Sequence, residues 1–102
     1  MPKAYVEIRT LPGWQGSVVR DIERLRSEGK ASPIQDCDVI FGDYDLMVVV
    51  DHNERKAFHK AIGDISRLNG VSSTNSRVVM DKEDVEESLG QRLRPSKLAG
   101  AP

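Results

Sequence analysis

The sequence predicts a single α+β domain of the ferredoxin-like type, with four strands and two helices in the order βαββαβ. Two observations carry this prediction. Segments in which apolar and polar side chains alternate, as in strands, are separated by segments with the apolar spacing of helices. The run Leu46–Val50 is apolar at every position, which indicates a strand covered on both faces. Two helices that each follow a strand through right-handed crossovers cover only one face of the sheet, so its second face needs another cover.

The first half of the chain contains a predicted strand, a helix and a second strand. Ala4, Val6 and Ile8 alternate with polar residues, which is typical of a strand with one apolar face. The following segment predicts a one-sided helix that ends near Gly29, with apolar positions Val18, Val19, Ile22 and Leu25. A second strand is predicted from about Gln35 to Phe41.

A hairpin and a second helix follow. Gly42 and Asp43 lie between the second strand and the apolar run, where the chain needs residues that tolerate positive φ. Asp51 and Glu54 have the spacing of a capping box, which predicts a helix start. The helix stops at Asn69 and Gly70, which suit a left-handed cap, and its apolar positions are Phe58, Ala61, Ile62, Ile65 and Leu68.

The last predicted strand runs from about Val71 to Met80 and completes the folded domain, which we place at residues 1–81. The composition changes at Lys82, and residues 82–102 predict a short helix followed by a flexible tail. A chain of 102 residues is long enough for one core and too short for two.

Composition limits the setting and the partners. The formal net charge is −1 with acids and bases interspersed, which argues against direct binding to nucleic acid or to an anionic membrane. No apolar run approaches the roughly 20 residues that cross a bilayer. The single Cys37 and the absence of a basic, apolar leader before Lys3 predict a cytoplasmic protein.

The uncovered face of the hairpin strand predicts a dimer. A second copy is the simplest cover, because two sheets stacked face to face would form an isologous interface and a dimeric α/β barrel. On the first strand, Tyr5, Glu7 and Arg9 are too polar for a dry seam and indicate a polar margin beside it. The predicted dimer-interface residues are Leu46, Met47, Val48, Val49 and Val50.

Residue patterns give little support for metal or catalytic chemistry. His52, His59 and Cys37 lie on different elements without paired-ligand spacing, so we predict no metal site. No activating base accompanies Cys37, so we predict no nucleophilic catalysis and no cofactor. Asp43 and Asp45 flank a tyrosine, but a role in holding the hairpin turn explains them better than a catalytic carboxylate pair.

The hairpin motif GDYDLMVVV and the strand motif SSTNS resemble the effector-binding domain of the Lrp/AsnC family, also called the RAM domain. The resemblance covers about residues 3–81. It implies a dimer formed by facing sheets, which in this family often assembles further into an octameric ring, with effectors such as amino acids bound between subunits. The effector-site residues that it implies are Gly42, Tyr44, Asp45, Thr74 and Ser76.

The resemblance also implies a regulatory role. Family members that regulate transcription carry an N-terminal helix-turn-helix domain, whereas here the first strand begins at about Lys3. The sequence therefore predicts a stand-alone effector domain that is not an enzyme, acts in transcriptional or metabolic regulation, and has a full-length Lrp/AsnC-type regulator as a candidate partner.

Two alternatives share the predicted topology. Cofactor-free enzymes of the dimeric α+β barrel type, such as oxygenases, need a general base inside the cavity, and neither histidine lies on a predicted strand. ACT-like modules use the same element order to bind amino acids. The hairpin motif favours the Lrp/AsnC-type domain over both.

Overall fold

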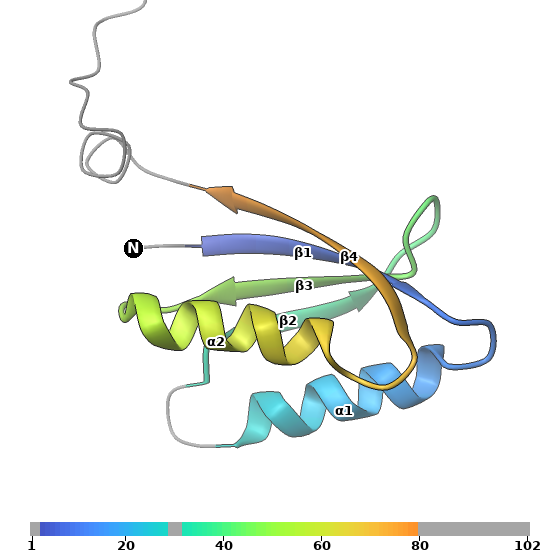
Figure 1. Cartoon of the computed structure of the whole chain (residues 1–102), viewed down its shortest axis with the longest axis horizontal. Helices are drawn as coiled ribbons and strands as arrows, with labels where there is room; N and C mark the ends of the chain where they lie inside the picture. Colours follow the sequence, from blue (N-terminus) through green and yellow to red (C-terminus); the bar gives the residue numbers. More distant parts are fainter. Residues whose placement is uncertain (1–2, 29–31, 80–102) are drawn as a thin grey trace, which may run out of the picture.

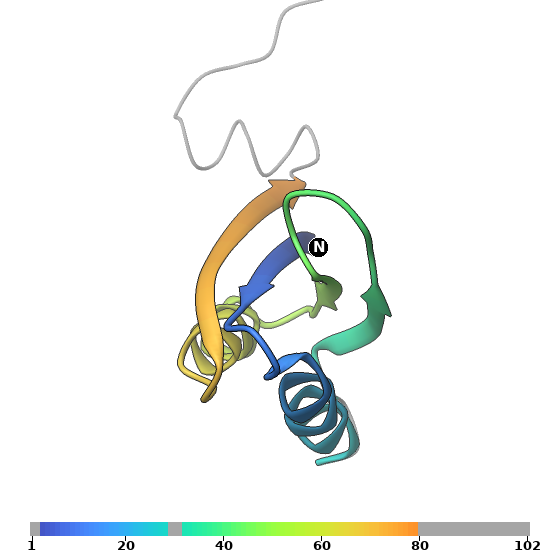
Figure 2. The same cartoon turned by 90° about the vertical axis from the view of Figure 1, so that its right-hand side faces the viewer.

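Four strands form one antiparallel sheet in the order β2-β3-β1-β4, and two helices lie together on one of its faces (Figures 1 and 2). The computed structural model describes residues 3–28 and 32–79, so the helix and tail predicted for 82–102 lie outside the described residues. The predicted order βαββαβ is confirmed. The elements are β1 (Lys3–Thr10), α1 (Gln15–Ser27), β2 (Ile34–Val39), β3 (Leu46–Asp51), α2 (Arg55–Ser66) and β4 (Val71–Val79).

The core lies between the sheet and the helices. The apolar positions that alternate along β1 are all fully buried, and they pair across the sheet with the buried positions of β3, such as Val6 with Val48. Burying a side chain of this size stabilises the fold by about 1.5–3 kcal/mol relative to leaving it in water. The helices contribute Val18, Ile22, Phe58, Ala61 and Ile65 to this core.

The two faces of β3 have different environments. Leu46, Val48 and Val50 are 0% exposed and face the helices, whereas Met47 and Val49 are half-buried on the opposite face. Leu46, Val48 and Val50 therefore belong to the core of one chain and are not available as interface residues. Of the five predicted interface residues, Met47 and Val49 point outward, and the interface itself stays a prediction.

We call the sheet face without helices the open face. Besides Met47 and Val49, it carries the polar positions of β1, because cross-strand partners point to the same side of a sheet and Glu7 pairs with Met47. The expected polar margin beside the apolar part of β3 is thus present on this face. Its other β1 positions are Tyr5 and Arg9.

The start of α2 differs from the prediction. The capping box of Asp51 and Glu54 is wrong, because Asp51 is the last residue of β3 and its amide donates to the carbonyl of Pro33 at 2.8 Å. No side chain caps the first turn of α2, although Nδ1 of His52 accepts a hydrogen bond from the amide of the N-cap residue Glu54 at 2.9 Å. A capping box needs its two residues at the N-cap and N3 positions, whereas here Glu54 is itself the N-cap and Asp51 lies three residues before it.

The end of α2 is partly as predicted. The helix ends at Ser66, earlier than its apolar pattern indicates, while Gly70 adopts the predicted left-handed conformation with φ +93°. The carbonyl of Gly70 accepts a hydrogen bond from the amide of Leu11 at 2.8 Å, which ties the loop after α2 to the loop after β1. A Cβ on Gly70 would lie 2.8 Å from Trp14, so glycine also allows this close approach.

Candidate functional site

The loop of residues 40–45, between β2 and β3, projects from one end of the sheet (Figure 1) and contains the predicted hairpin motif. Gly42 has φ +130°, which confirms the predicted positive φ for this residue, whereas Asp43 does not adopt a positive φ. The amide of Ile40 donates to the carbonyl of Asp45 at 3.0 Å, and the amide of Asp45 donates to the carbonyl of Ile8 at 2.9 Å. These bonds fix the loop to the end of β1.

The carboxylate of Asp45 holds the loop in place. Its Oδ2 accepts hydrogen bonds from the amide of Thr10 at 2.8 Å and from the hydroxyl of Thr10 at 3.2 Å. The side chain of Gln15, at the start of α1, donates to the carbonyl of Asp45 at 3.4 Å. The interpretation of Asp45 as a residue that maintains the hairpin shape is confirmed. Its role in effector binding stays a prediction.

Arg9 is a member of this site that the sequence analysis placed only on a polar margin. Its Nε and Nη2 donate to the carbonyl of Asp43 at 3.0 and 2.8 Å, and its guanidinium lies 5.2 Å from the ring centroid of Tyr44. A guanidinium carries five N–H donors, so the two that contact Asp43 leave donors for an anionic group. The alternation along β1 predicts that Arg9 and Glu7 share one face of the sheet. The sequence does not show that the loop of residues 40–45 packs against Arg9, because that contact depends on the fold.

The hydroxyls of β4 lie on two different faces. Thr74 is paired with Ile8 and Ser76 with Val6, so both predicted hydroxyls point to the side of the sheet that carries the helices. Ser73 is the β4 hydroxyl paired with Arg9. The structure therefore does not bring Thr74 and Ser76 to the face of Arg9 within one chain. The sequence could not distinguish these hydroxyls, because the register of β4 depends on pairing.

A polar cluster occupies the middle of the open face. The side chain of Glu7 is only 14% exposed, although it lies on this face. Its Oε1 accepts a hydrogen bond from Nδ2 of Asn75 at 3.3 Å and forms an ion pair with Nε of Arg77 at 3.1 Å. This arrangement holds a carboxylate in a fixed position beside Met47, its partner on β3.

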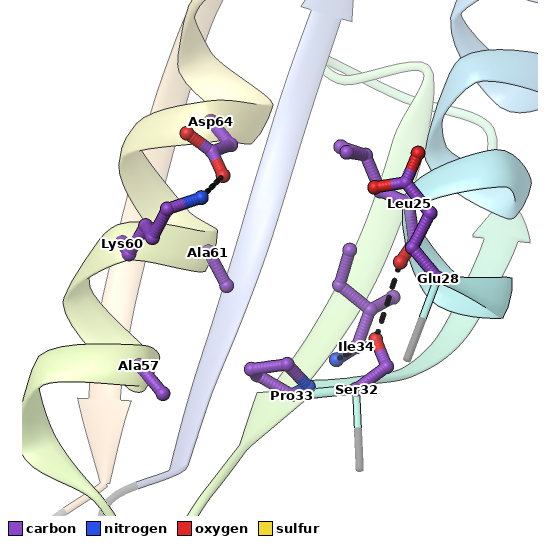
Figure 3. A pocket seen from close by; sticks show the side chains of 9 residues that line it. All are labelled: Leu25, Glu28, Ser32, Pro33, Ile34, Ala57, Lys60, Ala61 and Asp64. Carbon is purple, nitrogen blue, oxygen red and sulfur yellow. Dashed lines mark hydrogen bonds and ion pairs between the residues drawn. The ribbon is translucent and has the colours of Figure 1, made fainter. Parts of the chain in front are cut away.

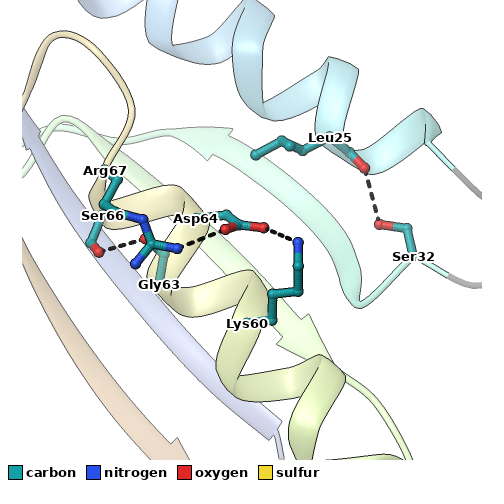
Figure 4. A network of polar contacts seen from close by, with 7 residues as sticks. All are labelled: Leu25, Ser32, Lys60, Gly63, Asp64, Ser66 and Arg67. Carbon is teal, nitrogen blue, oxygen red and sulfur yellow. Dashed lines mark hydrogen bonds and ion pairs between the residues drawn. The ribbon is translucent and has the colours of Figure 1, made fainter.

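A cavity of about 180 Å³ lies elsewhere, between α1 and α2 (Figure 3). It contains none of the five predicted effector-site residues. On its rim, Asp64 accepts hydrogen bonds from Lys60 and Arg67, both at 2.8 Å (Figure 4), and the bond from Lys60 is the main reason why the pKa of Asp64 is lowered. We call this cavity the helix groove, and its lining residues are Leu25, Glu28, Ser32, Pro33, Ile34, Ala57, Lys60, Ala61 and Asp64.

Cys37 is poorly suited to nucleophilic chemistry. Burial raises the pKa of its thiol to about 11, with the negative charges of Glu23 and Asp38 acting in the same direction. The thiolate, which is the reactive form, is therefore scarce at neutral pH. Within residues 3–28 and 32–79, no three His, Cys, Asp or Glu side chains gather as metal ligands, and no helix there has the length and apolar character to cross a membrane.

A family model and individual sequence relatives indicate the same family for this chain. The family model described as the Lrp/AsnC ligand binding domain matches residues 3–89. An uncharacterized HTH-type transcriptional regulator of Pyrococcus horikoshii is 30% identical over 73 residues, which are 69% of this chain and 47% of that protein. The chain spans about half the length of the curated relatives that it matches.

Solved structures confirm the fold. The crystal structure of FFRP-DM1 has a TM-score of 0.66 at 20% identity, covering 78% of this chain and 100% of that chain. The complex of the transcriptional regulator NMB0573 of Neisseria meningitidis with L-Met has a TM-score of 0.60 at 16% identity, covering 79% of this chain and 51% of that chain.

Proposed function

This chain belongs to the Lrp/AsnC ligand-binding domain family, and on that premise we propose that it binds an amino-acid effector and transmits its presence to a transcriptional regulator. The folded unit that we assign to this function is residues 1–81. The relatives are named as HTH-type transcriptional regulators, which supports a full-length regulator as the partner and the cytoplasm as the setting.

The observation that carries the proposal is the fixed loop of residues 40–45 with Arg9 packed against it. A binding wall whose backbone is already held by hydrogen bonds loses little conformational freedom when a ligand arrives, so more of the contact energy appears as affinity. The loop is held through Asp45 on one side and through the carbonyl of Asp43 on the other.

The charges beside this loop match a zwitterion. An amino acid needs acceptors for its ammonium and donors for its carboxylate. The carboxylate of Asp43 and the carbonyls near Gly42 would accept from the ammonium, and the remaining N–H groups of Arg9 would donate to the carboxylate. Tyr44 would form part of the wall. The L-Met complex of the Neisseria regulator supports this class of effector.

A second copy would complete the site. Gly42 and Ser76 are exposed, and Tyr44, Asp45 and Thr74 are half-buried, so the five implied residues do not enclose a ligand in one chain. We propose that the open face stacks on its symmetry mate through Met47 and Val49, and that Thr74 and Ser76 contact effector bound by a neighbouring chain. Assembly beyond the dimer, as in an octamer, would bring such hydroxyls to another chain's loop.

We propose binding rather than catalysis as the activity. The nucleophile candidate Cys37 is held in its protonated form by burial, and the carboxylate of Asp45 is engaged in holding the loop. These observations favour an effector domain over an oxygenase-like enzyme. Between effector domains, the match to the Lrp/AsnC ligand binding domain over residues 3–89 supports this type over an ACT-like module.

The test is a thermal-shift screen of the full chain against the twenty amino acids, followed by calorimetry with the best ligand. A ligand that binds only the folded state raises the melting temperature. Arg9→Ala should weaken binding by about 10- to 100-fold, because hydrogen bonds to charged groups contribute about 1.5–3 kcal/mol. Arg20→Ala, on the exposed surface of α1, is the matched control for the lost charge.

The hydroxyl variants locate the second half of the site. Thr74→Val or Ser76→Ala should weaken binding by about 0.5–1.5 kcal/mol for each lost hydrogen bond. Ser73→Ala tests the alternative that the effector contacts the hydroxyl beside Arg9 in the same chain. Binding that is unchanged in Arg9→Ala and in all three hydroxyl variants would place the site elsewhere and contradict the proposed geometry.

A further inference from the structure

The helix groove is an open pocket with apolar side chains on both walls and the polar side chains of Ser32, Glu28, Lys60 and Asp64 beside them. Leu25 and Ile34 form one wall, and Ala57 and Ala61 form the opposite wall on α2 (Figure 3). Its volume of about 180 Å³ is large enough for an aromatic ring, since a cavity of about 150 Å³ with apolar walls binds benzene. The small side chain of Ala57 keeps the groove open to solvent on this side.

Phe41 is the most exposed large apolar side chain in the described part of the chain. Its exposed fraction is 98%, and the nearby Val39 is 57% exposed. It stands on the loop of residues 40–45, whose ends are held by the hydrogen bonds of Asp45. A phenylalanine on a fixed, projecting loop is available for burial by another molecule without loss of backbone freedom.

Phe41 cannot enter the groove of its own chain. Ile34, which lines the groove, begins β2, and Phe41 follows the end of this strand at Val39. A strand rises about 3.3 Å per residue, so Phe41 and the groove are separated by roughly 20 Å. Figure 1 shows the loop and the start of β2 at opposite ends of the sheet.

We propose that Phe41 of one copy of this chain inserts into the helix groove of another copy. The same chain carries a projecting ring and a groove of matching volume, but the two are too far apart to meet. A second copy of the chain can therefore supply the ring that fills the groove. Because the two surfaces differ, the contact is heterologous, and repeated contacts produce a ring or an open filament. The helix groove lies opposite the open face, so this contact is separate from the proposed sheet-face dimer. Phe41 itself precedes Gly42 on the loop of the proposed effector site, so the contact would bring that loop against a second copy.

Sedimentation velocity over a concentration series tests the contact with two variants. Phe41→Ser removes the ring, and Ala57→Arg fills the groove with a long charged side chain. Each should raise the dissociation constant of the assembly by at least about tenfold, as for a buried aromatic hot spot. Val78→Ser is the matched control, because Val78 is 49% exposed, lies on β4 and does not line the groove.

A mixture of the two variants provides the decisive result. The Ala57→Arg chain keeps Phe41 and the Phe41→Ser chain keeps an open groove, so the mixture should form complexes that neither variant forms alone. Circular dichroism checks that both variants are folded. If the folded variants do not associate in the mixture, the proposal is overturned, and a symmetric contact between the Phe41 loops of two copies is indicated instead. Equal mass distributions of the parent and Phe41→Ser would also overturn it. If Ala57→Arg does not fold, Ala57→Leu fills part of the groove with a smaller change.

Discussion

Val49→Lys is expected to separate the proposed dimer while leaving the monomer folded. Val49 is half-buried on the open face, whereas the adjacent Val48 is 0% exposed and contacts the helices. A lysine at position 49 can keep its ammonium in water when the chain is a monomer. In a face-to-face dimer the same ammonium would be taken out of water without a partner.

The expected magnitude follows from the symmetry of the contact. In an isologous interface each substitution occurs on both sides, so two lysines enter one seam and their like charges repel. Burying an unpaired charge costs several kcal/mol, and the flexible stem lets part of the charge reach the edge of the seam. Taking about 2 kcal/mol for each subunit gives about 4 kcal/mol, which raises the dissociation constant about 1,000-fold.

The assay is sedimentation velocity at several concentrations, with circular dichroism to check folding. Val49→Lys should sediment as a smaller species than the parent at every concentration and retain the parent's spectrum. Val48→Lys should unfold, because its charge would lie in the core of the monomer. Val49→Thr, with nearly the same volume, should keep most of the association. A folded Val49→Lys protein with the parent's sedimentation at low concentration would refute the assignment of the open face as the seam.

Three further variants probe the described fold. Asp45→Ala should lower the free energy of unfolding by about 1–3 kcal/mol in urea denaturation, because the amide of Thr10 loses a charged acceptor; an unchanged midpoint would show that the loop does not depend on this bond. Gly70→Ala should cost about 2–4 kcal/mol in the same assay, from the strained φ and the contact with Trp14, and a cost below about 1 kcal/mol would contradict the packing. The thiol of Cys37 has a pKa of about 11 in the folded chain, above its ordinary value of 9.0. As the pH rises, the thiol therefore loses its proton in the unfolded chain before it does so in the folded chain. This favours the unfolded state, so the free energy of unfolding falls between about pH 9 and pH 11. The free energy of unfolding of Cys37→Ala should fall less than that of the parent across this pH range. Parallel pH profiles of the two proteins would show that the Cys37 thiol does not contribute to the pH dependence.

Local patterns in the sequence determine the element order and the side chains of each element that face the core. The alternation of Ala4, Val6 and Ile8 is a property of a single strand, and all three are 0% exposed. The positive φ of Gly42 and Gly70 was predictable for the same reason, since backbone preferences act within a few residues.

Tertiary structure decided which side chains meet. A period of two shows which residues of one strand share a face, but the pairing register decides which residues of the next strand join them. Register places Thr74 beside Ile8 and Ser73 beside Arg9, which the hydroxyl cluster alone does not reveal. The packing of Arg9 on Tyr44 likewise joins segments far apart in the sequence, because a folded loop crosses the end of β1. The fold class was therefore accessible from local periodicity, whereas the composition of the site depends on contacts between strands that periodicity does not specify.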